Sequence, residues 1–233
     1  MILIRKSADR GYFDMGWLKT HHTFSFGDYY EPKFMGFSDL RVINEDFVAP
    51  GQGFPTHPHR DMEIITYLIS GSLEHKDSMG NGSVINAGEI QRMSAGTGVT
   101  HSEFNHSNIA SVHLFQIWIF PEKKGIAPGY EQKSISAEKV KNNLLMIASK
   151  NPDQNAVTIY QDAKLFAAQL EPGKSLSYAP ARGRKVWIQM ISGELNCAGN
   201  TLSASDALGV DDVESPLDFK ARKASHFLLF DLR

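Results

Sequence analysis

The chain lacks the features that mark secreted and membrane proteins. Its 233 residues include one cysteine, Cys197, so no disulfide can form within the chain. The N-terminal residues contain no apolar run of signal-peptide length, and no segment approaches the roughly 20 apolar residues of a membrane span. These absences predict a protein of the reducing cytoplasm with no membrane partner. Cys197 is interpreted as a small buried residue rather than a nucleophile, because no histidine lies near it in sequence.

The sequence also lacks an excess of charge of either sign. Lysine and arginine number 24 against 26 aspartates and glutamates, which gives a formal net charge of −2. A domain that binds nucleic acid through its charge carries a basic patch, and this balance offers none. We therefore expect no direct contact with nucleic acid. The length suffices for one large domain or two small ones.

Extended helical patterns are scarce, and short apolar or alternating runs dominate. Glycine, asparagine, aspartate and proline break these runs, which is typical of strands joined by tight turns. Asn81-Gly82 predicts a two-residue hairpin turn, because both residues tolerate positive φ. The clearest strands are 40–44, 64–69, 71–75, 90–93 and 113–119. Strands at this spacing predict an all-β sandwich or barrel.

Two pairs of potential metal ligands each follow a turn that contains glycine. They are His57-x-His59 and His101-x-Glu103. Because side chains on a strand return to the same face at every second residue, each pair can aim two donor groups at one point. Two such strands side by side would form a pocket of three histidines and one carboxylate, which suits Fe(II), Mn(II), Co(II), Ni(II) or Cu(II). The alternative is that both pairs are coincidental and lie on a solvated surface.

A second round of strands follows residue 135. Residues 134–148 are expected to form a short helix and 149–154 a linker, and strand patterns return at 157–160, 164–168, 185–190 and 226–230. The segment 69–73 (ISGSL) is echoed by 191–195 (ISGEL). Counting back from the glycines aligns His57 and His59 with Ala179 and Ala181. The echo indicates a duplicated barrel whose second copy has lost its ligands, although so short a match also arises by chance.

Several motifs resemble the cupin superfamily and, within it, the pirin family. The segments 51–71 and 98–105 resemble the two cupin motifs, with one extra residue before Gly71 and with Gly96 where many cupins have proline. The stretches 17–18, 22–26, 56–63, 74–81, 94–103 and 116–119 resemble bacterial pirin-like quercetin dioxygenases, densely over 15–135 and sparsely afterwards. The resemblance implies an all-β bicupin of two cupin-type (double-stranded β-helix) barrels. Residues 1–135 would form the metal-binding barrel, and residues 136–233 a degenerate barrel without metal.

The resemblance also implies a set of ligands. In the pirin family the ligands match His57, His59, His101 and Glu103, whereas many other cupins use the glutamate that matches Glu63. Both carboxylates are present, so the fourth ligand stays open, with Glu103 preferred. The implied cofactor is one divalent transition metal per chain, with Fe(II) first and Mn, Ni, Co, Cu or Zn as alternatives.

The activity that this resemblance implies is a metal-dependent dioxygenase, which uses O2 to open the heterocyclic ring of flavonols such as quercetin. Glu103 would be the catalytic residue that takes the proton of the substrate hydroxyl. The chain is expected to be a monomer. One alternative is a non-catalytic metal-binding regulatory protein acting through a protein partner; another is an isomerase or an enzyme for a different phenol. The residues expected to line the substrate pocket are Phe54, Glu63, Met93, Gln116 and Trp118.

Other residues near the predicted site receive supporting roles. Thr56, Asn44 and Gln116 lie on or beside apolar strands and are candidates to orient the imidazoles through their free ring nitrogens. His75 stands beside the hairpin turn and is expected to be solvated. Pro58 has no N–H to donate, so its strand should be irregular or lie at a sheet edge.

Overall fold

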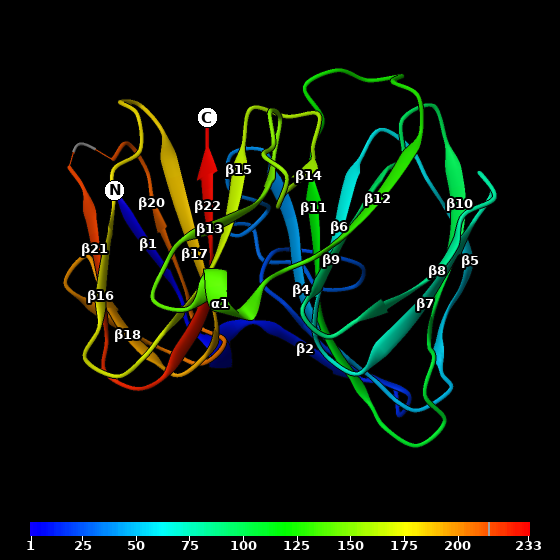
Figure 1. The fold of residues 1–233 in the computed structure, drawn as a ribbon, viewed down its shortest axis with the longest axis horizontal. Coiled ribbons are helices and arrows are strands. Elements are labelled where there is room, and N and C mark those ends of the chain that lie inside the picture. The colour runs from blue at the N-terminus through cyan, green and yellow to red at the C-terminus, as the bar shows by residue number, and fades with distance from the viewer. Residues whose placement is uncertain (214) are drawn as a thin grey trace. The chain divides into compact units, whose positions relative to one another are not determined.

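Strands make up most of the secondary structure of the chain, which a computed structural model describes at residues 1–213 and 215–233 (Figure 1). They form two compact units. The N-terminal unit contains Gly11–Ser134 and Val157–Gln161, and the C-terminal unit contains Met1–Arg10, Ile135–Ala156 and Asp162–Arg233. The first ten residues thus belong with the C-terminal unit, whereas the sequence predicted one boundary at 135. No helix in the described part of the chain has the length and hydropathy needed to span a membrane.

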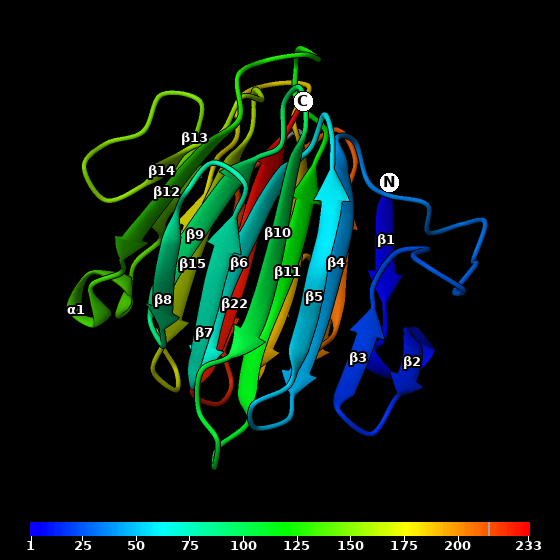
Figure 2. The ribbon, with the colours of Figure 1, turned by 90° about the vertical axis from the view of Figure 1, so that its right-hand side faces the viewer.

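The N-terminal unit consists of two antiparallel sheets. The larger sheet has the strand order β12-β9-β6-β11-β4-β3-β2, and the smaller sheet has the order β5-β10-β7-β8. The larger sheet contains β2 (Gly11–Asp14), β3 (Leu18–His22), β4 (Leu40–Val48), β6 (Glu63–Ser70), β9 (Glu89–Ser94), β11 (Val112–Ile119) and β12 (Gly129–Ser134). The smaller sheet, whose strands lie side by side in Figure 2, contains β5 (Gly53–His59), β7 (Ser72–Asp77), β8 (Gly82–Asn86) and β10 (Val99–Asn105). The short strand β14 (Val157–Thr158) also belongs to this unit.

Buried and more exposed residues alternate along the strands, so that one face of each sheet points into the unit. In β10 every second residue from Val99 to Asn105 is buried, and the residues between them are more exposed. Leu73 and Ile85 of the smaller sheet pack against Leu68 of the larger one. Each such fully buried aliphatic side chain stabilises the fold by about 1.5–3 kcal/mol. The core of this unit therefore lies between its two sheets.

The C-terminal unit repeats this arrangement, with six strands in its larger sheet instead of seven. Within the unit, its larger sheet runs β1-β20-β17-β22-β15-β13 and its smaller sheet runs β16-β21-β18-β19. The larger sheet contains β1 (Ile2–Arg5), β13 (Leu145–Ser149), β15 (Lys164–Leu170), β17 (Lys185–Ser192), β20 (Ala207–Val210) and β22 (Ser225–Leu232). The smaller sheet contains β16 (Ser175–Tyr178), β18 (Glu194–Cys197), β19 (Asn200–Ser203) and β21 (Leu217–Ala221). Because corresponding strands follow the same order in the two units, the fold is a duplicated one.

One glycine turn explains the sequence echo. Gly71 joins β6 to β7 and Gly193 joins β17 to β18, with φ values of 83° and 86°. A Cβ atom would lie 2.9 Å from the carbonyl oxygen of Ser111 at the first position, and 2.1 Å from that of Ala224 at the second. Only glycine fits both the backbone conformation and the space. The echoed segments therefore mark the same turn in the two units.

Strand registers extend this correspondence to single residues. The echo pairs His75 with Cys197, since each lies four residues after its glycine. His75 is opposite Glu103 on β10, and Cys197 is opposite Phe219 on β21. The counterpart of Glu103 is therefore Phe219. Cys197 is buried, and burial raises the pKa of its thiol to about 12, which fits the predicted packing role.

The registers also correct the predicted alignment of the first histidine pair. His57 is opposite His101, whereas in the C-terminal unit Tyr178 is opposite Leu217. The counterpart of His57 is thus Tyr178 rather than Ala179. Counting from the glycines gave the wrong position because the connections to the next strand differ in length, spanning 60–62 in one unit and 179–184 in the other.

Helices are short in the described residues. A 3-10 turn, η1 (Ser7–Asp9), and one α-helical turn, α1 (Ala137–Val140), are present. The side chain of Ser136 caps α1 by accepting a hydrogen bond from the backbone N–H of Lys139. The helix predicted at 134–148 ends early, because Leu145–Ser149 pairs as β13 with β15. Pairing between strands outweighs local helix propensity here.

Candidate metal centre

The two predicted ligand pairs lie on adjacent strands. β5 and β10 pair antiparallel, with His57 directly opposite His101. β5 is an edge strand of the smaller sheet, as Pro58 predicts (Figure 2). The register shifts between His101 and Glu103, so that Glu103 lies opposite Phe54. This irregularity lies between the two predicted ligands on β10.

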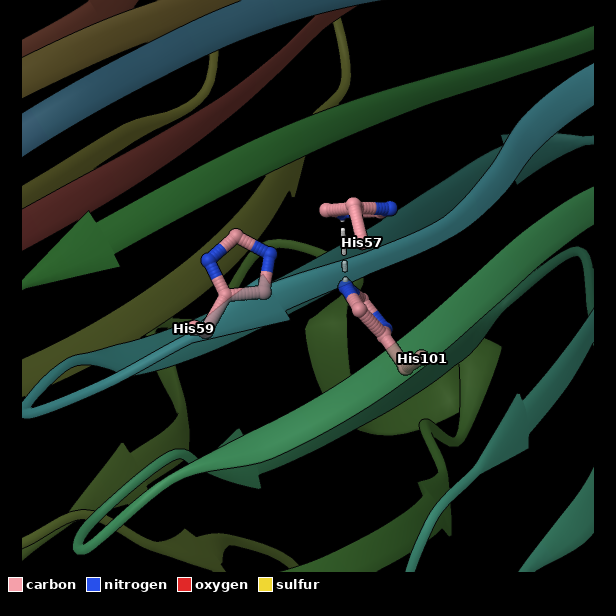
Figure 3. Close-up of side chains that lie close together, drawn as sticks. All are labelled: His57, His59 and His101. Atoms are coloured by element: carbon pink, nitrogen blue, oxygen red, sulfur yellow. Dashed lines mark hydrogen bonds between the residues drawn. The ribbon is translucent and has the colours of Figure 1, made fainter.

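Three imidazole rings converge where these strands meet (Figure 3). The Nε2 atoms of His57 and His101 are 3.1 Å apart, and a ring nitrogen of His59 lies within 4.8 Å of ring nitrogens of both. Nδ1 of His57 lies 2.8 Å from the carbonyl oxygen of Pro55. A carbonyl oxygen only accepts, so Nδ1 donates the proton and Nε2 keeps a lone pair. This lone pair is available to a metal ion between the rings.

Burial keeps two of these rings uncharged. Loss of hydration, together with the neighbouring rings of His101 and His57, lowers the pKa of His59 to about 4. Burial, together with His57 and His75, lowers the pKa of His101 to about 3. Near pH 7 both rings are therefore neutral, which is the protonation state that coordinates metals.

Glu103 is the carboxylate next to the histidines. It is 2% exposed, and one of its oxygens lies within 4.8 Å of ring nitrogens of His101 and His75. Thr66 Oγ1 donates to Oε1 at 3.2 Å, and Gln116 Nε2 donates to Oε2 at 2.9 Å. Both donors belong to the larger sheet, so they hold the carboxylate across the interior of the unit. Each carboxylate oxygen keeps further acceptor capacity.

The prediction of a solvated His75 is wrong, because this side chain is fully buried behind His101. β7 pairs with β10, and this pairing places His75 opposite Glu103 with its ring inside the unit. Its Nδ1 lies 3.5 Å from Nδ1 of His101, and its Nε2 lies 3.0 Å from Oδ2 of Asp77. His75 therefore connects the imidazole of His101 to a carboxylate.

Asp77 is held in place by the turn that follows it. Its Oδ1 accepts from the backbone N–H groups of Met79 and Asn81, and its Oδ2 accepts from Nδ2 of Asn81. Burial alone would raise the pKa of Asp77, but the hydrogen bonds from His75, Asn81 and Met79 outweigh burial and lower it. The turn spans residues 78–81, between β7 and β8, and is longer than the two-residue turn predicted at Asn81-Gly82.

An apolar cavity of about 370 Å³ opens beside the imidazoles. Of the predicted pocket residues, Phe54, Gln116 and Trp118 line it. Trp118 meets the rings of His59 and Phe26 edge-on, with centroid distances of 5.0 and 5.3 Å. The remaining lining residues are Asn44, Asp46, Pro55, Thr56, His57, His101 and Glu103. Aromatic walls with a few convergent polar groups suit a flat, partly polar ligand.

The structure places two predicted pocket residues, Glu63 and Met93, elsewhere in the unit. Met93 does not line the cavity and packs in an apolar cluster of the core, against which the cavity residue Trp118 packs. Glu63 is fully buried and accepts hydrogen bonds from Ser94 Oγ at 2.8 Å and from the backbone N–H of Tyr160 at 3.3 Å. Burial raises the pKa of Glu63, and these two bonds offset the rise in part. Among the described residues, the clusters of potential ligands contain Glu103 and not Glu63.

The groups that orient the imidazoles differ from those expected. Gln116 bonds to Glu103 rather than to a ring, while Thr56 and Asn44 line the cavity. The carbonyl oxygen of Pro55 and the ring of His75 contact the imidazoles instead. Sequence carries no signal for a carbonyl contact. The strand parity of His75 with the buried Leu73 could have revealed its inward direction.

A row of buried polar side chains crosses the larger sheet next to the site. Gln116 of β11 lies opposite Thr66 of β6 on one side and Asn44 of β4 on the other. The row continues to Gln91 of β9 and to His22 of β3. Gln116 is the most exposed of the five, at 9%. Polar side chains thus form a continuous row across five strands of this sheet.

Comparison with known proteins decides the family. The family model described as "Pirin" matches residues 4–119, and that described as "Quercetinase C-terminal cupin domain" matches residues 146–232. The chain is 46% identical over 232 residues to "Quercetin 2,3-dioxygenase" of Escherichia coli strain K12, covering 100% of this chain and 99% of that protein. The chain belongs to the pirin family. The predicted family is confirmed.

Solved structures agree with this assignment of the pirin-family chain. The crystal structure of YhhW from Escherichia coli matches with a TM-score of 0.96 and 45% identity, covering 100% of this chain and 98% of that one. A structure of bacterial pirin YhhW in complex with nickel(II) matches with a TM-score of 0.95, 45% identity and coverage of 100% and 99%. The predicted all-β fold with two cupin domains is confirmed.

Proposed function

We propose that this pirin-family chain is a metal-dependent dioxygenase that opens the heterocyclic ring of flavonols such as quercetin, with O2 as its second substrate. The relatives named quercetin 2,3-dioxygenase support the reaction class. The observation that carries the proposal is the convergence of three imidazole rings at the wall of an apolar cavity of about 370 Å³. The expected monomeric state and the expected cytoplasmic location stay predictions.

The proposed ligands are His57, His59, His101 and Glu103. The chemistry of this donor set fits a divalent transition metal, because neutral imidazoles and a carboxylate are its preferred ligands. We favour Fe(II), with Mn, Ni, Co, Cu and Zn as alternatives; the relative YhhW binds nickel(II). When bound, the ion would supply Lewis acidity and a position for the substrate oxygens.

Asp77 and His75 determine which nitrogen of His101 carries its proton. The Asp77 carboxylate accepts from Nε2 of His75, so Nδ1 of His75 is left as an acceptor. This acceptor faces Nδ1 of His101 at 3.5 Å, which places the proton of His101 on Nδ1. Nε2 of His101 then keeps its lone pair on the side of His57. The tautomer that a metal requires is thus set by protein groups.

Glu103 is also proposed to take the proton of the flavonol hydroxyl. It lies in the cavity wall beside His101, and its carboxylate is fixed by Thr66 and Gln116. A carboxylate held in one orientation accepts a proton without reorganisation of its surroundings. Trp118 and Phe26 offer aromatic edges that exclude water from the flat substrate.

The test is anaerobic reconstitution of metal-free protein with each of the six ions, followed by exposure to quercetin and O2. Metal-dependent oxygen consumption and carbon monoxide release would support the proposal, and both should collapse in His57→Ala. His106→Ala is the matched control, because His106 is exposed and lies outside the site. If every metal-loaded form binds quercetin without turnover above that of the free metal, the non-catalytic regulatory function replaces the dioxygenase.

A further inference from the structure

A second cavity adjoins the first within the N-terminal unit. Its volume is about 290 Å³, and it shares Phe26, Asn44, Asp46 and Phe54 with the cavity beside the imidazoles. Residues that line only the second cavity are Phe13, Met15, Trp17, Leu18, Thr20, His22, Gly27 and Asp28. Because four residues are common to both linings, the two cavities lie next to each other.

The second cavity has apolar walls and a polar floor. Trp17 and Phe54 both line it and contact each other edge-on, with their ring centroids 5.2 Å apart. β3 and β4 form the polar floor. Thr20 lies opposite Asp46, and Asn44, two residues before Asp46 on β4, lies opposite His22. These three polar residues are 2%, 3% and 4% exposed, in the order Thr20, Asp46, Asn44. Polar atoms this deeply buried are costly unless a partner meets them.

Two atoms of the floor lack such a partner. Thr20 Oγ1 and Asn44 Oδ1 form no hydrogen bond with any group in the described part of the chain. A buried acceptor without a hydrogen bond typically costs the full free energy of removing it from water. A ligand that donates hydrogen bonds to these two atoms would offset that cost. Asp46 adds a carboxylate, which only accepts hydrogen bonds when it is ionised.

The fold itself does not require these polar groups. In the C-terminal unit the strand that corresponds to β4 is β15, and its registers place Phe166 at the position of Asn44 and Ala168 at that of Asp46. Both are apolar, and the same sheet forms without a polar floor. The floor of the second cavity is therefore specific to the unit that carries the imidazoles.

We infer that the second cavity is a subsite for a hydroxylated aromatic ring, whose phenolic O–H groups donate to Thr20, Asn44 and Asp46 while its faces pack against Trp17 and Phe54. The inference rests on the proposed function: the other end of the same flavonol occupies the cavity beside the imidazoles. Such a subsite selects among flavonols by the hydroxyl groups on the pendant phenyl ring.

The test compares three flavonols that differ only on that ring: quercetin with two hydroxyls, kaempferol with one and galangin with none. Dissociation constants are measured under nitrogen with nickel-loaded protein, so that no turnover occurs. Wild type should bind quercetin about 10-fold more tightly than galangin, since each phenolic hydrogen bond contributes a few-fold. Thr20→Val and Asn44→Leu should each weaken quercetin binding about 3- to 10-fold and leave galangin binding within about twofold.

Thr97→Val is the matched control, because Thr97 is exposed and outside both cavities. Thr20→Val keeps the shape of the side chain and removes an unpartnered hydroxyl, so its unfolding midpoint should not fall. Equal losses for all three flavonols, or none, would overturn the subsite while leaving the proposed function intact. If wild type binds none of the three, the proposed function itself fails.

Discussion

In the N-terminal unit a row of buried polar side chains crosses five strands, and in the C-terminal unit the equivalent row is apolar. Gln91, Thr66, Gln116, Asn44 and His22 in the first correspond to Leu208, Ile188, Leu229, Phe166 and Met146 in the second. Both rows lie in sheets with the same strand order. The same strand order is therefore compatible with apolar residues at all five positions of the row. The polar row marks the unit for which we propose small-molecule binding.

The positions of the proposed ligands and of His75 differ in the same way. His101, Glu103 and His75 correspond to Leu217, Phe219 and Cys197, which are part of one apolar cluster in the C-terminal unit. Tyr178, the counterpart of His57, packs against that cluster. Where the N-terminal unit has a cavity and converging donors, the C-terminal unit has a filled core. Variants that exchange residues between these positions test the comparison directly.

The largest effect is expected from Phe219→Glu, which gives the C-terminal unit the carboxylate of its counterpart. The donors that hold Glu103 are replaced there by Ile188 and Leu229, so the new charge would be buried without a partner. We expect a loss of about 3–5 kcal/mol in the free energy of unfolding, measured by urea denaturation. Asp218→Glu on the exposed side of the strand is the control. A loss below about 1 kcal/mol would contradict the account of a filled core.

Removing a proposed ligand should have the next largest effect. His101→Ala should reduce bound metal from close to one ion per chain to almost none, measured by elemental analysis after reconstitution. Turnover should fall more than about 100-fold, because a direct ligand matters more than the groups behind it. His106→Ala is the control, and equal metal content in both variants would rule out the proposed site.

Gln116→Leu introduces the residue of the C-terminal unit into the polar row. It removes the 2.9 Å hydrogen bond to Glu103 Oε2 and leaves the apolar packing of the sheet in place. We expect kcat/KM for quercetin to fall about 10- to 100-fold, with the unfolding midpoint unchanged or raised. Gln52→Leu at an exposed position serves as control. Unchanged turnover would show that Glu103 does not depend on this donor.

His75→Leu tests the connection to Asp77 and should have a smaller effect. Without an acceptor at Nδ1 of His75, His101 loses the group that fixes its tautomer. Metal affinity, measured by competition with a chelator, should fall about 10-fold. The ¹⁵N chemical shifts of His101 in metal-free protein should change from the Nδ1–H form to a mixture of tautomers. Lys76→Gln, on the outer face of the same strand, should change neither measurement.

The smallest effect concerns the C-terminal unit and depends on pH. Burial alone would raise the pKa of Asp206, but hydrogen bonds from Lys6, Ser7 and Ser203 outweigh burial and lower it. This stabilisation is present above the unfolded pKa, near 4, and is lost as the pH falls through the lower folded value. Asp206→Asn should therefore reduce the free energy of unfolding by about 1–2 kcal/mol at pH 7. Denaturation at a series of pH values should show this difference disappearing in acid, and a constant difference would contradict it.

Local sequence patterns predicted the strands, and they also predicted that the imidazole rings lie close together. The period of two along a strand predicted that His57 and His59 share one face, and that His101 and Glu103 share one face. His75 was misplaced because its surroundings in sequence are polar and form a turn, while its burial comes from the pairing of β7 with β10, where His75 lies opposite Glu103.

The polar row and the second cavity were not predictable in the same way. Thr66, Gln116 and Asn44 are far apart along the chain and become neighbours only through the registers of β6, β11 and β4. Registers depend on bulges and loop lengths, as the shift from Ala179 to Tyr178 shows. Met93 was assigned to the pocket from its closeness to the ligand strands and from parity, but it packs with Ile64 and Val99 in the core.

The two prolines of β5 have a consequence for self-association. An exposed edge strand offers unpaired N–H and C=O groups to which a strand of another molecule can add. Pro55 and Pro58 have no N–H, so neither position can donate to an incoming strand. The edge that bears His57 and His59 is therefore a poor template for β-sheet extension between chains, and it can form a wall of the cavity without promoting aggregation.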